Sequence, residues 1–462
     1  CMLAMFYDAE TYVARRLLSM SVTAPKYTMT DEEADERIAR IEQERGITLA
    51  PEQKSAVKLC LSSSAAVVTG GPGTGKTTII TTVLALLEDL KLSAVLAAPT
   101  GRAAKRISEV TGEEAKTLHR LLGMKPDSGA EGKFTYNESN PLDADVVIAD
   151  EASMIDILLA NALLRAIKPG GKLILCGDAD QLPSVGPGNV LRDLIESQEV
   201  PQVRLTEIFR QAQQSLIVTN AHAIVHGRLP ELHRHDNDFF FLKRERAEQI
   251  LSTTLDLVNT RLPKSYGYDP LRDIQVITPA KQGPLGTREL NRLLQNKLNP
   301  PMKGKSEAVL MGRTLREGDK VMQVRNNYDI VWQQPDGTAG TGIFNGDMGM
   351  IEMLDNGSKT IQVRFEDKLA TYSFENQDQL EHAYAVTVHK SQGSEFEAVV
   401  MPLERRHPRL HYRNLLYTAV TRARRLLIMT GQRETVYAMV QNDRRTLRYT
   451  NQKEMLREMV EE

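Results

Sequence analysis

The sequence has few of the features that mark membrane, secreted or metal-binding proteins. Its 462 residues contain no run of 18 apolar residues, so nothing in it predicts a transmembrane helix. Only Cys1, Cys60 and Cys176 are cysteines, and their spacing matches neither a disulfide framework nor a metal site. No secretory signal pattern is present either. We therefore expect a protein of the reducing cytoplasm that has no membrane partner.

An excess of charge of one sign is also missing. The formal net charge is −2, from 58 Lys and Arg against 60 Asp and Glu. A nucleic-acid site would therefore have to consist of local basic clusters, because there is no global positive field. Internal repeats and low-complexity tracts are absent as well. The length suits roughly two to four domains.

The N-terminal residues show helical patterns. The chain begins with Cys1, and "MFYDAETYVARRLL" is already an amphipathic helical pattern. The stretch "TMTDEEADERIARIEQERG" has a threonine and acidic start and a glycine stop at Gly46. We predict helices over residues 1–45 and expect the chain to be an N-terminally truncated fragment of a longer protein.

Two series of apolar strands predict two α/β domains. Between residues 65 and 205, "AAVVT", "SAVLAAP", "DVVIAD" and "KLILCGD" each precede a helical segment. Such near-continuous apolar strands indicate a parallel sheet with helices on both faces. A second series comprises "IQVITP", "AVVMPL" and "RLLIMTG". Between them, residues 305–383 contain short strands separated by Asn-Gly and Asp-Gly pairs, which predict hairpins and a small β-barrel.

The stretch "GGPGTGKT" (residues 70–77) matches a phosphate-binding loop. It follows an apolar strand and precedes an apolar helix, which is the context the motif requires. Its glycines allow backbone N–H groups to turn toward the phosphates of a nucleotide, Lys76 is expected to reach the β and γ phosphates, and Thr77 to hold Mg²⁺. Asp150 and Glu151 end a later apolar strand, where one can orient Mg²⁺ and the other polarise the attacking water.

Further polar residues suit a motor whose hydrolysis depends on domain closure. Gln181 follows another strand, where it can sense the γ-phosphate. Arg210 in "EIFRQ" and Arg422 in "YTAVTRARR" can stabilise charge in the transition state. In "TVHKSQGSEF", Thr387 and His389 suit contacts with nucleic-acid phosphates. Glu395, in the same stretch, is placed to bind a ribose.

The motif series resembles that of a known family. "LAPEQKSAV", "GGPGTGKTT", "APTGRAAKRI", "KTLHRLLG", "DEASM", "GDADQLPSVGPG", "EIFRQ", "TVHKSQGSEF" and "YTAVTRARR" are similar, in this order, to the motifs of superfamily 1 helicases. Their wording is most similar to the RecD-like DNA helicases of the exodeoxyribonuclease V alpha type. The similarity runs from about residue 45 to about residue 432, and several of the motifs are specific over eight or more residues.

The resemblance implies a fold of two RecA-like P-loop NTPase domains, which are parallel sheets flanked by helices. The first domain is expected over residues 46–210, with a β-hairpin pin inserted at about 123–141, and the second over 211–304 and 384–462. The insertion at 305–383 is then expected to be a small β-barrel similar to a Src-homology-3 domain. Relatives of this type carry a large N-terminal region with helix-hairpin-helix repeats.

The resemblance also implies an ATPase site between the two domains, with ATP and Mg²⁺ as cofactors, in which Gln53 reads the adenine. The expected catalytic residues are Lys76, Asp150, Glu151, Gln181, Arg210 and Arg422. The expected cofactor-binding residues are Gln53, Gly71, Pro72, Gly73, Thr74, Gly75, Lys76, Thr77, Thr78 and Glu395, with the metal at Thr77 and Asp150. Single-stranded DNA is expected along Thr100, Arg102, His119, Thr387 and His389.

The implied activity is ATP-dependent translocation on single-stranded DNA from 5′ to 3′ with unwinding of duplex. We expect a monomeric bacterial protein of the cytoplasm and nucleoid that acts at junctions of single- and double-stranded DNA in recombination or repair. Two alternatives stay open: a helicase of the upframeshift type acting on RNA or DNA, and a nucleotide-gated ATPase switch with a protein partner. Trp332, the only tryptophan, is expected either to pack on the barrel or to stack on a base.

Overall fold

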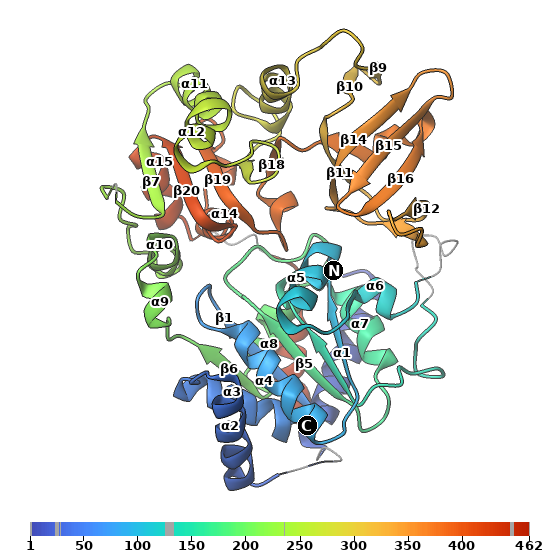
Figure 1. Cartoon of the computed structure of the whole chain (residues 1–462). Helices are drawn as coiled ribbons and strands as arrows, with labels where there is room; N and C mark the ends of the chain where they lie inside the picture. Colours follow the sequence, from blue (N-terminus) through green and yellow to red (C-terminus); the bar gives the residue numbers. More distant parts are fainter. Residues whose placement is uncertain are drawn as a thin grey trace. The chain divides into compact units, whose positions relative to one another are not determined.

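A computed structural model describes residues 2–23, 27, 29–124, 134–234, 236–443 and 448–461. The chain forms two compact units (Figure 1), which are described separately. The first comprises Cys1–Gln213 and Thr446–Glu462, and the second comprises Gln214–Arg445. Among the described helices, none is long and apolar enough to cross a membrane.

The first unit contains a six-stranded sheet in which every pairing is parallel. The strand order is β3-β2-β4-β5-β1-β6. The strands are β1 (Ala65–Gly70), β2 (Ala94–Ala98), β3 (Ala115–Thr117), β4 (Val146–Ala149), β5 (Lys172–Gly177) and β6 (Gln202–Leu205). The four strands predicted from the sequence form the centre of this sheet, whereas the short edge strands β3 and β6 were not predicted.

Helices cover both faces of this sheet. Successive residues of a strand point to opposite faces, so each strand contributes side chains to two apolar cores. In β1, Ala65 and Val67 belong to one apolar core, and Ala66 and Val68 to the other. The first core is completed by α1 (Ala4–Val22), α6 (Leu118–Leu121), α7 (Ile157–Ala166), α8 (Val190–Ser197) and α16 (Gln452–Glu461). The second is completed by α2 (Asp31–Arg45), α3 (Pro51–Ser62), α4 (Lys76–Asp89) and α5 (Gly101–Thr111).

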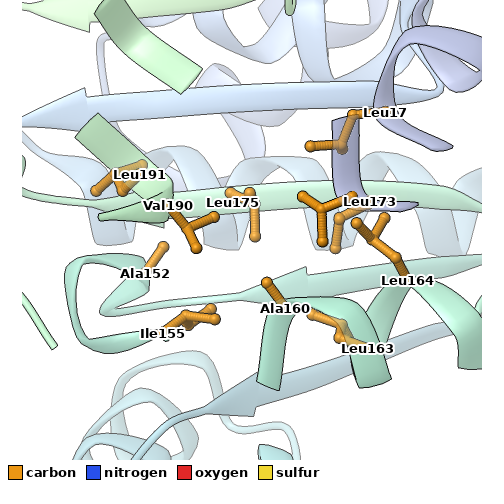
Figure 2. Close-up of a pocket in the computed structure, with 11 residues that line it drawn as sticks. Leu17, Ala152, Ile155, Ala160, Leu163, Leu164, Leu173, Leu175, Val190 and Leu191 are labelled. Carbon is orange, nitrogen blue, oxygen red and sulfur yellow. The ribbon is translucent and has the colours of Figure 1, made fainter. Parts of the chain in front are cut away.

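A small cavity lies in the first of these cores (Figure 2). Side chains of α1, α7, α8 and β5 line it, including Leu17, Leu164, Leu173 and Leu191. Its volume is about 10 Å³, which is about the space of one water molecule. Because the lining is apolar, a water would find no partners there. The cavity is therefore a gap in the packing of the core.

Helix α2 begins and ends where the sequence predicts. Thr30 and Glu33 form a capping box, in which the Glu33 N–H donates to Thr30 Oγ1 at 3.2 Å. Gly46 ends the helix with φ of 62°, a left-handed conformation that suits glycine. The helical prediction for the N-terminal region is confirmed by α1 and α2.

The C-terminal helix departs from the predicted domain division. Residues 384–462 were all expected in the second domain, but the chain after Arg445 groups with the first unit. The physical reason lies in α16, whose Met455 and Leu456 are buried in the core beside α1. A single apolar face on a short helix does not reveal which core receives it.

The second unit contains a five-stranded sheet, again with parallel pairings only. Its order is β18-β8-β19-β20-β7. The strands are β7 (Phe239–Lys243), β8 (Ile274–Thr278), β18 (Ala385–Thr387), β19 (Phe396–Leu403) and β20 (Ala423–Gly431). Its helices are α10 (Leu216–Val225), α11 (Ala247–Asp256), η3 (Leu257–Arg261), α12 (Leu262–Tyr266), α13 (Thr287–Leu298), α14 (Arg413–Val420) and α15 (Arg433–Gln441).

Between β8 and β18 the chain forms an antiparallel β structure, as the turn signals predict. It comprises a hairpin of β9 and β10 and a seven-stranded sheet in the order β13-β12-β16-β15-β14-β11-β17. The strands are β9 (Glu307–Leu310), β10 (Arg313–Arg316), β11 (Lys320–Gln323), β12 (Asn327–Gln333), β13 (Ala339–Ile343), β14 (Met348–Asp355), β15 (Thr360–Phe365), β16 (Lys368–Ser373) and β17 (Leu380–His382). Gly337 and Gly346 take positive φ in two of its turns.

Trp332 packs on this sheet. Its ring lies so close to the backbone of β13 that a Cβ on Gly340 would come within 2.4 Å of it. The Lys368 ammonium lies 4.7 Å from the ring centroid on the adjoining strand. These contacts support the first of the two interpretations of Trp332, a side chain that packs on its own domain.

A buried carboxylate joins the antiparallel structure to α13. Asp319 is fully buried and accepts hydrogen bonds from Gln295 of α13 and from Asn299, which follows that helix, both at 2.7 Å. It also accepts from the Tyr384 hydroxyl at 2.8 Å and contacts His382 at 3.1 Å. Burial alone would raise the pKa of Asp319, but the bonds from His382, Asn299 and Tyr384 outweigh it and hold that pKa below its usual range.

We predict that Asp319→Ala destabilises the second unit by about 3 kcal/mol, because several buried donors lose their acceptor. Urea unfolding followed by the fluorescence of Trp332 measures this directly, since that residue lies in the adjoining sheet. Asp329→Ala on β12 is the matched control, because that side chain is exposed. Equal urea midpoints for the two variants would contradict a stabilising role of Asp319 between α13 and the antiparallel sheet. Because the Asp319 pKa is depressed, its contribution is present at neutral pH and is lost as the pH falls below about 3.9.

Candidate functional site

The phosphate-loop residues lie at the carboxyl edge of the first sheet. The loop leaves β1 at Gly70 and enters α4 at Lys76. Asp150 follows β4 and Asp178 follows β5; β5 lies beside β1 in the sheet, and β4 is the next strand after β5. Because the carboxyl ends of parallel strands meet at one edge, the fold brings these segments together, at the place where α/β sheets bind ligands.

Two glycines allow the loop to pack tightly. Gly75 has φ of 81°, and a Cβ there would lie 2.2 Å from Gln53 Nε2 and 2.5 Å from the Phe209 ring. A Cβ on Gly70 would lie 2.7 Å from Thr74 Oγ1. Larger residues would therefore push the loop away from α3 and from the segment around Phe209.

The Lys76 side chain folds over the loop. Its Nζ donates to the carbonyl oxygens of Gly70 at 2.5 Å and Gly71 at 3.1 Å. Thr74 Oγ1 donates to Gly71 at 2.9 Å. The loop thus combines a lysine ammonium with the free N–H groups of the first turn of α4, and both favour an anion. This donor set fits the phosphates of a nucleotide.

Gln53 supports the loop from α3. Its Nε2 donates to the carbonyl of Thr74 at 2.9 Å, while its Oε1 accepts from the Ala50 N–H at 2.9 Å. A cleft beside these groups is lined by α3, the loop and residues 205–209. The amide that the resemblance assigns to adenine therefore lies at a cleft next to the phosphate loop.

Asp150 and Glu151 form the acidic part of the site. Burial and the neighbouring Glu151 carboxylate raise the pKa of Asp150 to about 6, and the charges of Lys76 and Arg106 act in the opposite direction. Arg106 of α5 lies 3.7 Å from Glu151. Glu151 has φ of 52°, a strained conformation for a residue with a side chain. Such strain is typical of residues held in place for function.

Gln181 lies beside the end of β5. Its Nε2 donates to Asp178 at 3.2 Å, and both side chains are buried. The N–H of Ala179 contacts Thr69 of β1 at 3.4 Å. The segment that carries Gln181 is thus fixed to the strand that leads into the phosphate loop.

The segment around Arg210 also contacts the loop. Arg210 begins α9 (Arg210–Gln213), and its side chain lies outside the described part of the structure. The N–H of Phe209 donates to the carbonyl of Gly73 at 3.2 Å. Glu52 of α3 holds the preceding Thr206 through bonds of 2.7 and 2.6 Å. Phe209 and Glu52 were not predicted as site residues, although they are adjacent to Arg210 and Gln53, which were predicted.

The residues expected to contact DNA in the first unit lie around α5 and α6. Thr100 caps α5 by accepting from the Ala103 N–H at 3.3 Å, and Arg102 lies in its first turn. His119 packs near Phe134, with 6.3 Å between ring centroids. Burial lowers the pKa of His119, against the charge of Asp156, so the ring is neutral at physiological pH.

The predicted pin lies mostly outside the described residues. Its expected tip, residues 126–132, falls in the gap between 124 and 134. At the base, Met124 and Phe134 form an antiparallel bridge. The hairpin itself stays a prediction.

The second unit holds Thr387, His389 and Glu395 near the ends of its strands. Thr387 is buried and accepts from the Lys390 N–H at 3.3 Å. His389 is exposed, and desolvation by its neighbours together with the charge of Lys281 lowers its pKa. Glu395 pairs with Arg424 at 3.0 Å. His389 is therefore the member of this group that is open to a ligand.

Arg422 is buried inside the second unit, with a relative exposure of 2%. Its guanidinium donates to the carbonyls of Thr418 and Ser394, both at 3.1 Å, and to Thr421 Oγ1 at 3.2 Å. These bonds place it next to the segment of Glu395. A phosphate bound by this guanidinium would share its five N–H donors with these acceptors.

Comparison with protein families identifies three matching regions. Residues 53–187 match the AAA domain, and residues 290–365 match the SH3 domain of ATP-dependent RecD-like DNA helicases. Residues 382–430 match the C-terminal domain of UvrD-like helicases. The second match confirms the Src-homology-3 expectation for the antiparallel insertion.

Several characterised proteins are similar over most of the chain. The ATP-dependent RecD2 DNA helicase of Deinococcus radiodurans is 36% identical over 376 residues, which is 81% of this chain and 48% of that protein. The RecD subunit of the RecBCD enzyme of Mycobacterium tuberculosis is 32% identical over 426 residues, 83% of this chain and 70% of that subunit. The chain thus spans about half the length of the Deinococcus protein.

Among solved structures, a Pif1 helicase studied in DNA unwinding at forked duplexes is similar at 20% identity and a TM-score of 0.49. The match covers 83% of this chain and 92% of that chain. This likeness is too distant to place any residue of the site.

We predict that Gly75→Ala lowers the affinity for ATP at least about tenfold, because the new methyl group displaces Gln53 and Phe209. Gly112→Ala is the matched control: Gly112 has φ of 78°, but nothing lies within 4 Å of its Cβ position. In both variants the alanine in a left-handed conformation lowers the free energy of unfolding by about 1–2 kcal/mol, which thermal unfolding measures. Titration with a fluorescent ATP analogue separates them, and equal affinities would show that the close packing at Gly75 is unimportant.

Proposed function

The chain belongs to the RecD-like family of superfamily 1 DNA helicases, and on this basis we propose that it hydrolyses ATP to move along single-stranded DNA and unwind duplex. The family supports the activity, because the Deinococcus relative is named an ATP-dependent DNA helicase. One observation in this chain carries the proposal. The phosphate loop, Asp150 and the segment of Gln181 converge at one edge of a parallel sheet.

We propose the following roles in ATP hydrolysis. Backbone N–H groups of residues 71–78 and the Lys76 ammonium bind the phosphates, and Gln53 binds the adenine. Glu151 polarises the attacking water, and Gln181 reports the γ-phosphate to the rest of the molecule. Arg210 and Arg422 neutralise charge that develops in the transition state, and Glu395 binds the ribose.

Thr77 and Asp150 are proposed to hold Mg²⁺, which supplies charge neutralisation at the phosphate oxygens when bound. Within the described part of the chain, no three His, Cys, Asp or Glu side chains are grouped as metal ligands. A site of two oxygen ligands completed by phosphates and water is what Mg²⁺ prefers in nucleotide-binding proteins. Release of the Lys76 ammonium from Gly70 and Gly71 would free it for the phosphates.

We propose that single-stranded DNA binds along Thr100, Arg102, His119, Thr387 and His389. A neutral imidazole such as that of His119 can stack on a base without the desolvation cost of a charge. Arg102 is suited to a phosphate. Local contacts of this kind account for a nucleic-acid site in a chain whose net charge is −2.

We further propose translocation from 5′ to 3′, action as a monomer at junctions of single- and double-stranded DNA, and a role in recombination or repair in the bacterial cytoplasm and nucleoid. The direction and the pathway rest on the family resemblance. Some similar proteins are named subunits of the RecBCD enzyme, and a pull-down from its own host tests whether the whole protein binds partner subunits.

Lys76→Ala should reduce ATP hydrolysis at least about 100-fold, because the loop loses the charge that faces the phosphates. Binding of single-stranded DNA should persist, since the Lys76 ammonium donates to carbonyls of the loop and Lys76 is not one of the residues proposed to contact DNA. Lys58→Ala is the control, because that lysine pairs with Asp35 on the surface of the same unit. Phosphate release and fluorescence anisotropy with a labelled oligonucleotide give the two readouts. Hydrolysis that continues in Lys76→Ala would disprove the assignment of the loop.

Arg422→Gln should lose DNA-stimulated hydrolysis while ATP still binds, because a group acting in the transition state lowers kcat more than affinity. Arg425→Gln is the matched control, since Arg425 is exposed and pairs with Glu397. The carbonyls of Thr418 and Ser394 lose donors in the first variant, so Arg422→Lys is tested beside it. The fluorescence of Trp332 shows whether each variant is folded. Full stimulation in folded Arg422→Gln and Arg422→Lys would exclude this arginine from catalysis.

A further inference from the structure

The chain returns from the second unit to the first near its C-terminus. It first passes between the units at Gln213 and Gln214, and passes back between Arg445 and Thr446. The returning segment is described from Arg448 onward and leads into α16. Arg448 is thus the first described residue of this second covalent connection within the first unit.

Arg448 binds the loop that follows Gln181. Its Nη1 donates to the carbonyls of Gly186 and Gly188, the latter at 2.9 Å, and lies 3.4 Å from Ser184 Oγ. Its Nη2 donates to the carbonyl of Ser184. One guanidinium therefore holds three backbone carbonyls within five residues. A planar guanidinium, with five N–H donors in a fixed fork, suits such a set of acceptors.

The opposite side of the same loop packs against the start of α7. A Cβ on Gly186 would lie 2.1 Å from Asp156 Oδ2, and a Cβ on Gly188 would lie 2.9 Å from Ile157. The Ile157 N–H donates to the carbonyl of Pro187 at 2.9 Å. The loop is thus held between α7 and Arg448, with little freedom to shift. Burial lowers the pKa of Arg448, against the charge of Asp156.

We infer that Arg448 is a positioning residue for Gln181: by fixing the loop of residues 184–188, it sets the place of the glutamine that senses the γ-phosphate. The inference rests on the proposed ATP hydrolysis. Gln181 and Ser184 are both buried and are separated only by Leu182 and Pro183. A displacement of Ser184 is therefore transmitted to the Gln181 backbone, because proline limits the flexibility of the link.

Other contacts of the C-terminal segment anchor it independently of Arg448. Thr450 donates to Asp193 at 2.8 Å, and the N–H of Asn451 donates to Glu10 at 2.9 Å. Arg457 donates to the carbonyl of Glu196 at 2.8 Å. Met455 and Leu456 lie in the core. Removal of the Arg448 side chain should therefore leave α16 docked.

These contacts supply a matched control for the experiment. Arg457→Ala removes another arginine of the same segment that also donates to backbone carbonyls, but at the end of α8, away from the loop. Arg448→Ala and Arg448→Lys are compared with it and with the unmodified chain. The measurements are kcat and KM for ATP in the presence of single-stranded DNA, together with the thermal unfolding midpoint.

We expect Arg448→Ala to lower kcat roughly 10- to 100-fold with KM for ATP changed less than about threefold, because a misplaced γ-phosphate sensor slows the turnover of bound ATP more than it weakens ATP binding. Arg448→Lys should recover part of the loss, since one ammonium can reach only some of the carbonyls. Arg457→Ala should keep the kcat of the unmodified chain. Unchanged kcat in Arg448→Ala, or an equal loss in Arg457→Ala, would overturn the inference. Absence of hydrolysis in the unmodified chain would instead overturn the proposed function.

Discussion

The close packing of the phosphate loop against α3 and the Phe209 segment is the contact on which the arrangement of the first unit depends. At Gly75 there is no room for a methyl group, because Gln53 and Phe209 occupy that space. The same contact brings the cleft beside Gln53, the loop and the start of α9 to one place. Since Phe209 precedes Arg210 directly, the packing also fixes where α9 begins. A change of the nucleotide at the loop would therefore affect both α3 and the Phe209 segment.

Charged groups in both units are held by acceptors of their own unit. Lys76 binds loop carbonyls, and Arg422 binds the carbonyls of Thr418 and Ser394. Buried charges need such partners, because an unpaired one would cost several kcal/mol. If these groups bind phosphate, the anion competes with the carbonyls for their N–H donors. Such competition would link nucleotide binding to the structure of each unit.

Much of the fold and of the site could be predicted from the sequence, for identifiable reasons. Apolar strands followed by helices specify a parallel sheet, and the glycine pattern around Lys76 specifies the loop. The docking of α16 could not be predicted, because the packing of Met455 and Leu456 depends on a core formed by distant residues. Arg448 carries no local motif, since its acceptors are backbone carbonyls. The motif "YTAVTRARR" contains Arg422 but does not indicate that its side chain is buried.

The central claim is that nucleotide chemistry in this chain drives movement on DNA from 5′ to 3′. The most direct test is an unwinding assay on DNA and RNA duplexes that carry either a 5′ or a 3′ single-stranded tail, with and without ATP. The account predicts ATP-dependent separation of the DNA duplex with the 5′ tail. Unwinding of only the RNA substrates or only the 3′-tailed DNA, or ATP hydrolysis with no unwinding of any substrate, would contradict it.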